Sequence, residues 1–132
     1  MSVIYKPERD MEFIAPFGPT MGYYRMPEEL VDKLNSKMSD KLDDYSDNLV
    51  GKVSEELAFD KEIVQIAQDG LGQFIGQYQA YTELRNSFGK KELDTDKYNY
   101  GLQVVSGWFV RQFENEYNPL HIHTGCRLSC VG

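Results

Sequence analysis

The chain has 132 residues, which fits a single domain, and its 41% hydrophobic content can build a core and excludes wholesale disorder. A formal net charge of −7 disfavours general binding to nucleic acids and to anionic membrane surfaces. No apolar run approaches the roughly 18 residues of a membrane span, and residues 1–10 lack the apolar core of a signal peptide. Two cysteines, Cys126 and Cys130, do not make a disulfide scaffold, so we expect a protein of the reducing cytoplasm.

The first 88 residues predict a short β-hairpin followed by two helices. Residues 12–25 alternate apolar residues with proline and glycine, which is typical of two short strands around a turn. Pro27 suits a first helical turn, and apolar residues then recur at helical spacing over about 27–44. Asp60 is a candidate N-cap for a second helix, whose apolar stripe runs from Ile63 to Leu84 and which Gly89 would end.

The last third of the chain predicts strands. Residues 90–101 are charged and predict a loop, whereas residues 102–113 are rich in Val, Phe and Trp, which favour strands. Alternation places Trp108 and Val110 on one face and Phe109 and Arg111 on the other, and Gly107 suggests a bulge. A second strand is expected from residue 120 past residue 128. Together these elements predict an α+β fold for the chain. We expect both helices to pack their apolar stripes on one side of an antiparallel sheet that contains residues 104–113.

A histidine pair is the strongest chemical signal. His121 and His123 are the only histidines, and residues i and i+2 of a strand point to the same face, so both imidazoles could bind one metal ion. Imidazole suits iron, zinc, copper and nickel. The alternative is that both are half-exposed strand residues beside a turn, since two ligands alone do not make a metal site.

The search for a third ligand leaves several alternatives open. Cys126 could be a soft ligand, but in a regular strand it would face away from His123. Glu114 and Glu116 lie across the preceding turn and are possible ligands. A cupin would carry a glutamate four or five residues after the second histidine, where this chain has Arg and Leu. Cys126 and Cys130 would be roughly 13 Å apart in a strand, too far for a disulfide, and are more simply read as core residues or bystanders.

The run WFVRQFENEYNPLHIHTG at residues 108–125 resembles the iron(II)- and 2-oxoglutarate-dependent oxygenases common in marine bacteria and their phages. The continuation LSCVG at 128–132, FGP at 17–19 and LVGK at 49–52 match this family too. The resemblance implies a double-stranded β-helix, or jelly-roll, core with helices packed outside. It also implies an iron held by a His-x-Asp/Glu pair and a distal histidine, with an Arg or Lys that binds the co-substrate 2-oxoglutarate.

Carried onto this chain, the resemblance makes His121 the first iron ligand and puts His123 where the acidic ligand is expected. Arg111, Gln112 and Tyr117 flank this pair and are candidates for binding substrate or co-substrate. The distal histidine and the co-substrate arginine are expected beyond Gly132. We therefore read residues 1–132 as a single oxygenase-like domain that is incomplete at its C-terminus, with a helical part at about 27–88 and the start of a jelly-roll at about 102–132.

The leading hypothesis is an iron(II)- and 2-oxoglutarate-dependent dioxygenase, or hydroxylase, of unknown substrate, in a bacterial or phage-infected cell. Its expected partner is a small-molecule co-substrate, and residues 1–132 alone are expected to be inactive because they lack a third ligand. A strand edge at residues 128–131 would favour association into a homo-oligomer. The alternative hypotheses are a non-enzymatic, phage-type jelly-roll domain with a structural or interaction role, with or without metal, and a cupin-like metal protein.

Overall fold

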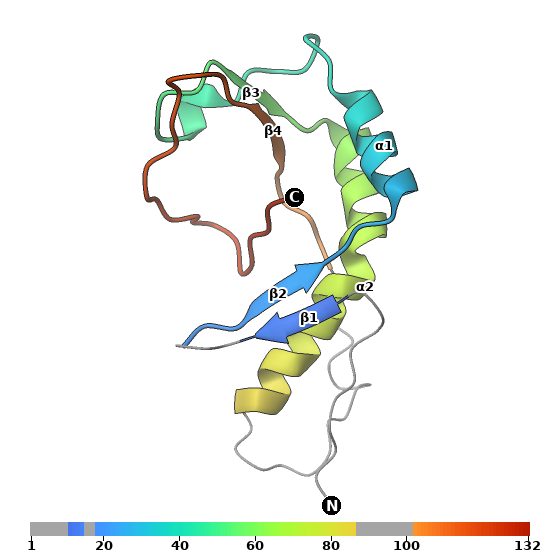
Figure 1. Ribbon diagram of the computed structural model, residues 1–132. Coiled ribbons are helices and arrows are strands. Elements are labelled where there is room, and N and C mark those ends of the chain that lie inside the picture. The colour runs from blue at the N-terminus through green and yellow to red at the C-terminus, as the bar shows by residue number, and fades with distance from the viewer. Residues whose placement is uncertain (1–10, 15–17, 87–101) are drawn as a thin grey trace, which may run out of the picture. The chain divides into compact units, whose positions relative to one another are not determined.

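The structure, a computed structural model, describes residues 11–14, 18–86 and 102–132 (Figure 1). In chain order its elements are β1 (Met11–Ile14), β2 (Met21–Tyr24), α1 (Glu28–Lys37), a 3₁₀ turn η1 (Ser46–Asn48), β3 (Glu55–Ala58), α2 (Lys61–Asn86) and β4 (Trp108–Arg111). The described residues thus form a mixed α/β fold with two antiparallel two-stranded sheets, β1–β2 and β3–β4, and no closed barrel.

These elements form two compact units. The hairpin unit comprises the described residues 11–14, 18–32, 67–86 and 102–103, and the histidine unit comprises residues 33–66 and 104–132. Neither helix of the described residues has the length and hydrophobicity required to cross a membrane. The predicted loop at 90–101, the cap at Gly89 and Phe17 of the FGP match lie outside the described residues.

In the hairpin unit, the predicted β1–β2 hairpin is confirmed, and one of its faces packs on α2 (Figure 1). The ring of Phe13 stacks on Phe74 and Tyr81, with centroid distances of 6.1 and 5.3 Å. Gly22, opposite Phe13 in the register, is needed because a Cβ there would lie 2.9 Å from the ring of Tyr78. The part of the apolar stripe of α2 that carries Phe74 and Tyr81 therefore packs on this hairpin. Packing of the stripe on the sheet of residues 104–113 stays a prediction.

Helix α1 was predicted to reach residue 44 but ends at Lys37. The chain turns there because Ser39 Oγ accepts the backbone N–H of Lys41, a local bond that competes with the helix. Near its start α1 packs against α2, where Gly70 leaves room for the side chain of Leu30.

The predicted start of α2 is confirmed. The carboxylate of Asp60 accepts the backbone N–H of Ile63 at 2.9 Å, which is the bond expected of an N-cap residue. Ile63 is only 1% exposed, so this first turn also provides the centre of the apolar core of the histidine unit.

The sheet of the histidine unit differs from the prediction in its strands. β4 begins at Trp108 rather than at residue 102, and its predicted alternation is correct: Trp108 lies opposite Ala58, and Arg111 lies opposite Glu55. Its partner β3 was missed because its sequence, EELA, contains no β-branched or aromatic residue. Gly107, where a bulge was expected, directly precedes β4, and the ring of Phe59 covers it where a Cβ would lie.

Residues 112–132 contain no helix or strand, so the predicted strand from residue 120 past residue 128 is wrong. Leu120, Ile122 and Val131 are fully or almost fully exposed, at 103%, 84% and 100%. A strand requires a neighbouring strand to pair with its N–H and C=O groups, and none of the described strands pairs with this segment.

Candidate metal centre

The two histidines meet in the segment that follows β4. Nε2 of His121 lies 3.2 Å from Nε2 of His123, and the two rings are inclined at 69°. The rings are close, as predicted, although the expected reason was wrong because the segment is not a strand. Two imidazole nitrogens bound to one ion at ~2.1 Å are separated by about 3.0 Å at an angle of 90° and by about 3.4 Å at the tetrahedral angle. The observed separation lies between these values.

A backbone hydrogen bond determines which nitrogen of His121 carries a proton. Nδ1 of His121 lies 2.7 Å from the carbonyl oxygen of Pro119, and a carbonyl can only accept a hydrogen bond. Nδ1 is therefore the donor, and the neutral ring of His121 presents the lone pair of Nε2 toward His123. Metal-binding histidines in proteins are oriented by the same kind of bond from their second nitrogen.

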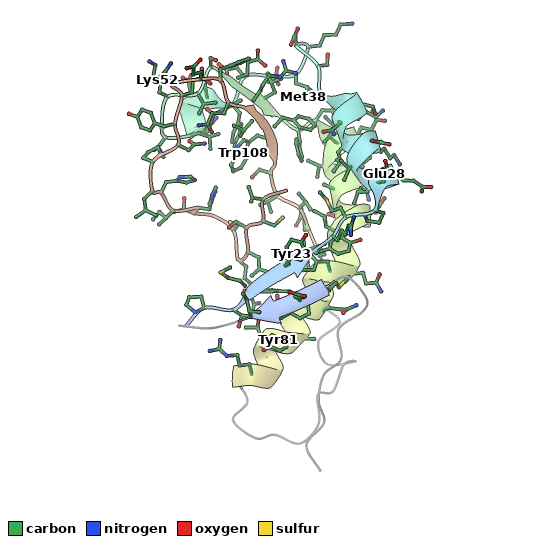
Figure 2. All side chains as sticks on the ribbon, in the orientation of Figure 1. Tyr23, Glu28, Met38, Lys52, Tyr81 and Trp108 are labelled. Carbon is green, nitrogen blue, oxygen red and sulfur yellow. The ribbon has the colours of Figure 1, made fainter. Side chains whose placement is uncertain are left out.

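The second imidazole rests on an aromatic stack. The ring of His123 stacks on Trp108, with centroids 5.6 Å apart, and Trp108 in turn stacks on Tyr45 at 5.1 Å. Trp108 is the first residue of β4, and Figure 2 shows its side chain at that strand. The regular sheet of the histidine unit thus holds one side of the pair.

The turn before the histidines is joined to the segment before β3, at Lys52 (Figure 2). The backbone of Lys52 donates to the carbonyl of Tyr117 at 2.8 Å and accepts the N–H of Tyr117 at 3.0 Å. Gly51 has φ of +117°, and a Cβ there would lie 2.5 Å from the carbonyl oxygen of Tyr117 and 2.9 Å from Oδ1 of Asn118. Only glycine permits this backbone conformation and this close approach.

The carboxylate of Glu116 also joins the turn before the histidines to the segment before β3. It accepts the backbone N–H of Ser54 at 3.0 Å, the hydroxyl of Ser54, and the backbone N–H of Phe113 at 2.9 Å. These hydrogen bonds, first those from Phe113 and Ser54, lower the pKa of Glu116 below its ordinary value. The sequence offered Glu116 as a third metal ligand, but both of its oxygens already accept hydrogen bonds, Oε1 from Ser54 and Oε2 from Phe113.

Glu56 was missed by the sequence analysis. It lies on β3, is only 3% exposed, and its Oε1 is buried without a hydrogen-bond partner. Burial, followed by repulsion from Asp44 and Glu116, raises the pKa of this carboxyl above its ordinary value. The only signal available in the sequence was the pair of acidic residues directly preceding the apolar run Leu57–Phe59.

The described residues do not bring a third ligand to the histidine pair. No group of three or more His, Cys, Asp or Glu side chains among residues 11–14, 18–86 and 102–132 is placed to hold a metal ion. Cys126 and Cys130 are free and exposed, so neither is a core residue. Partial desolvation nevertheless raises the pKa of the Cys130 thiol.

The three residues predicted to flank the site have different surroundings. Arg111 forms an ion pair with Glu55 at 2.8 Å, on the face of the β3–β4 sheet opposite Trp108. Gln112 donates its side-chain N–H to the carbonyl of Glu116 at 2.7 Å, within the turn. Tyr117 is 58% exposed and holds Lys52 through its backbone. A role for these residues in binding substrate or co-substrate stays a prediction.

Comparison with known proteins adds no relative, since no family model, curated protein or solved structure matches the chain.

Proposed function

We propose that this chain carries the first two metal ligands of an iron(II)- and 2-oxoglutarate-dependent oxygenase that hydroxylates an unidentified substrate and is built on a jelly-roll core. One observation supports the proposal beyond the resemblance of residues 108–125. The Nε2 atoms of His121 and His123 converge to 3.2 Å, and the tautomer of His121 directs its lone pair toward His123.

The donor set fits iron(II) in part. Two neutral imidazoles are suitable ligands for ferrous iron, and their spacing matches that of two ligands on one ion. Histidine at position 123, in place of the acid typical of the family, adds no negative charge to the site. A catalytic iron also needs a third protein ligand, which the described residues do not place beside the pair.

In this proposal the residues of the chain have distinct tasks. His121 and His123 would hold the iron, the carbonyl of Pro119 would keep the proton of His121 on Nδ1, and Trp108 would cover one face of His123. When bound, iron would supply one chemistry, the conversion of 2-oxoglutarate, O₂ and a substrate C–H bond into succinate, CO₂ and an alcohol. The segment that carries the pair is exposed to solvent.

The first experiment uses the only tryptophan of the chain as its probe. Because Trp108 stacks on His123, iron(II) added without oxygen should quench its fluorescence in a saturable manner. His121→Ala and His123→Ala should each weaken the apparent affinity at least about tenfold. Glu114→Gln and Cys126→Ser test the remaining ligand candidates and should have no effect. Quenching in both histidine variants that equals the quenching in the native protein would refute the proposal, and the two rings would then simply share a hydrogen bond.

The second experiment follows succinate formation from 2-oxoglutarate under air. We expect residues 1–132 to form none above the background of the His121→Ala variant, because two imidazoles leave the iron one protein ligand short. Turnover that requires both histidines would support the proposed chemistry and overturn the expectation that this chain is inactive. A loss of that turnover in Glu114→Gln or Cys126→Ser would then identify the third ligand.

A further inference from the structure

We infer that Glu116 is a positioning residue for the histidine pair: together with Gly51 and Ser54 it fixes the turn whose Pro119 carbonyl selects the tautomer of His121. The role rests on the proposed function in one respect, since it matters for catalysis only if the pair binds metal. The tautomer itself can be measured without metal.

The first step of the argument is the bonding of the Glu116 carboxylate. Its two oxygens take up three donors, two from Ser54 before β3 and one from Phe113 after β4. A carboxylate is the side chain suited to this arrangement, because both of its oxygens accept and neither donates. Glu116 thereby ties the turn after β4 to the segment that leads into β3.

The second step is the backbone junction beside it. Lys52 and Tyr117 exchange two hydrogen bonds, and Gly51 allows the chain to approach the carbonyl of Tyr117 and the side chain of Asn118. The turn at residues 113–118 is thus held at three of its residues, namely Phe113, Glu116 and Tyr117. We call these contacts the turn clamp: Gly51 and Lys52 beside Tyr117, Ser54 with Glu116, and Phe113 with Glu116 within the turn.

The third step leads from the turn clamp to the imidazole. Pro119 follows the clamped Tyr117 by two residues, and its carbonyl accepts the Nδ1 proton of His121. Every residue from Asn118 to Gly132 is exposed, so burial does not hold the position of this carbonyl. Release of the turn clamp should free Pro119 and let the neutral ring of His121 move its proton to Nε2, which would block the nitrogen that faces His123.

The test is a measurement of the His121 tautomer by nitrogen-15 NMR in the metal-free protein at a pH where the ring is neutral. The native protein should show the proton on Nδ1. Glu116→Gln, which leaves one acceptor oxygen in place of two, and Ser54→Ala, which removes only the hydroxyl donor, should shift His121 toward the Nε2–H form. Asp47→Asn is the matched control, since it neutralises an exposed acid of the same unit outside the turn clamp and should leave the tautomer unchanged.

Iron(II) affinity, measured by Trp108 quenching, gives the second readout. Glu116→Gln should weaken binding by about tenfold, the size typical of an altered partner of a metal-binding histidine. Glu116→Asp, which keeps both acceptor oxygens, should recover part of the loss. Native tautomer and native affinity in folded Glu116→Gln and Ser54→Ala would overturn the inference. If the native protein binds no iron(II), the proposed function fails, whereas the tautomer experiment still decides whether Glu116 positions His121.

Discussion

The two units hold their chains in place by different means. In the hairpin unit, aromatic rings from β1, β2 and α2 stack on one another. For example, the ring centroid of Phe74 lies 6.1 Å from that of Phe13 and 5.1 Å from that of Tyr24. In the histidine unit, the segment that carries the candidate site is exposed and is held by the turn clamp and by one stack on Trp108. Apolar packing supports the hairpin unit, whereas directional polar bonds position the exposed site segment of the histidine unit.

The two kinds of contact respond differently to substitution. A stack of aromatic rings tolerates rotation but not loss of a ring, since a cavity remains. A hydrogen-bonded turn is sensitive to small changes in geometry, because hydrogen bonds weaken steeply with distance and angle. Its disruption exposes little apolar area. We therefore expect substitutions in the hairpin unit to change stability and substitutions in the turn clamp to change the histidine pair.

The largest expected effect is the loss of an aromatic ring. Phe74→Ala should lower the free energy of unfolding by ~3 kcal/mol, because Phe74 stacks on both β1 and β2. Denaturant unfolding measures this loss. Tyr23→Ala, on the exposed face of the hairpin, is the control and should cost less than ~0.5 kcal/mol. An equal cost for both variants would contradict the packing described for this unit.

The next effect is a gain of stability in the histidine unit. Glu56→Gln should raise the free energy of unfolding by ~1 kcal/mol at pH 7, because it removes a buried charge whose Oε1 has no hydrogen-bond partner. The pKa of Glu56 in the folded chain is raised above its ordinary value of 4.5, so ionisation destabilises the native protein as the pH rises through this range. The advantage of the variant should therefore disappear below pH 4.5.

Unfolding curves recorded from pH 4 to pH 7 measure this dependence. An advantage that persists unchanged at pH 4 would show that Glu56 is not ionised at neutral pH or is not destabilising. Glu116 should behave in the opposite way: its lowered pKa means that its ionised form stabilises the native protein, and this contribution is lost as the pH falls.

A smaller loss is expected at the beginning of α2. Asp60→Ala should cost ~1 kcal/mol, because the backbone N–H of Ile63 loses its capping bond. Asp60→Asn keeps an acceptor oxygen and should cost less than half as much. Thermal unfolding of the three proteins measures the difference, and an alanine variant as stable as the native protein would argue against the cap.

The smallest expected effect concerns the exposed ion pair of the β3–β4 sheet. Arg111→Ala should change stability by less than ~1 kcal/mol, because Arg111 and Glu55 are screened by water. This small cost makes the variant suitable for testing Arg111 as a co-substrate residue. Calorimetric titration with 2-oxoglutarate in the presence of iron(II) should then show weaker binding if Arg111 contacts the co-substrate, and unchanged binding would end that hypothesis.

Local sequence signals predicted the elements that depend on neighbouring residues. The hairpin at residues 11–24 and the cap at Asp60 were found because turn residues and capping bonds involve residues close in sequence. The alternation of Trp108 and Phe109 on β4 was found for the same reason, since the strand period is local. Strand β3 was not found, because only pairing with β4, some fifty residues later, makes EELA a strand.

For the candidate site, the amino-acid sequence alone shows which chemical groups are available: two imidazoles separated by one residue, next to an Asn-Pro turn. The positions and orientations of the two rings come from the folded chain. The two Nε2 atoms lie 3.2 Å apart, the Pro119 carbonyl accepts the Nδ1 proton of His121, and Trp108 stacks on the ring of His123. The turn clamp depends on contacts between residues about sixty positions apart, such as Ser54 with Glu116. Such contacts leave no periodic pattern in a single sequence, because they are made between side chains and backbone groups that only the folded chain brings together.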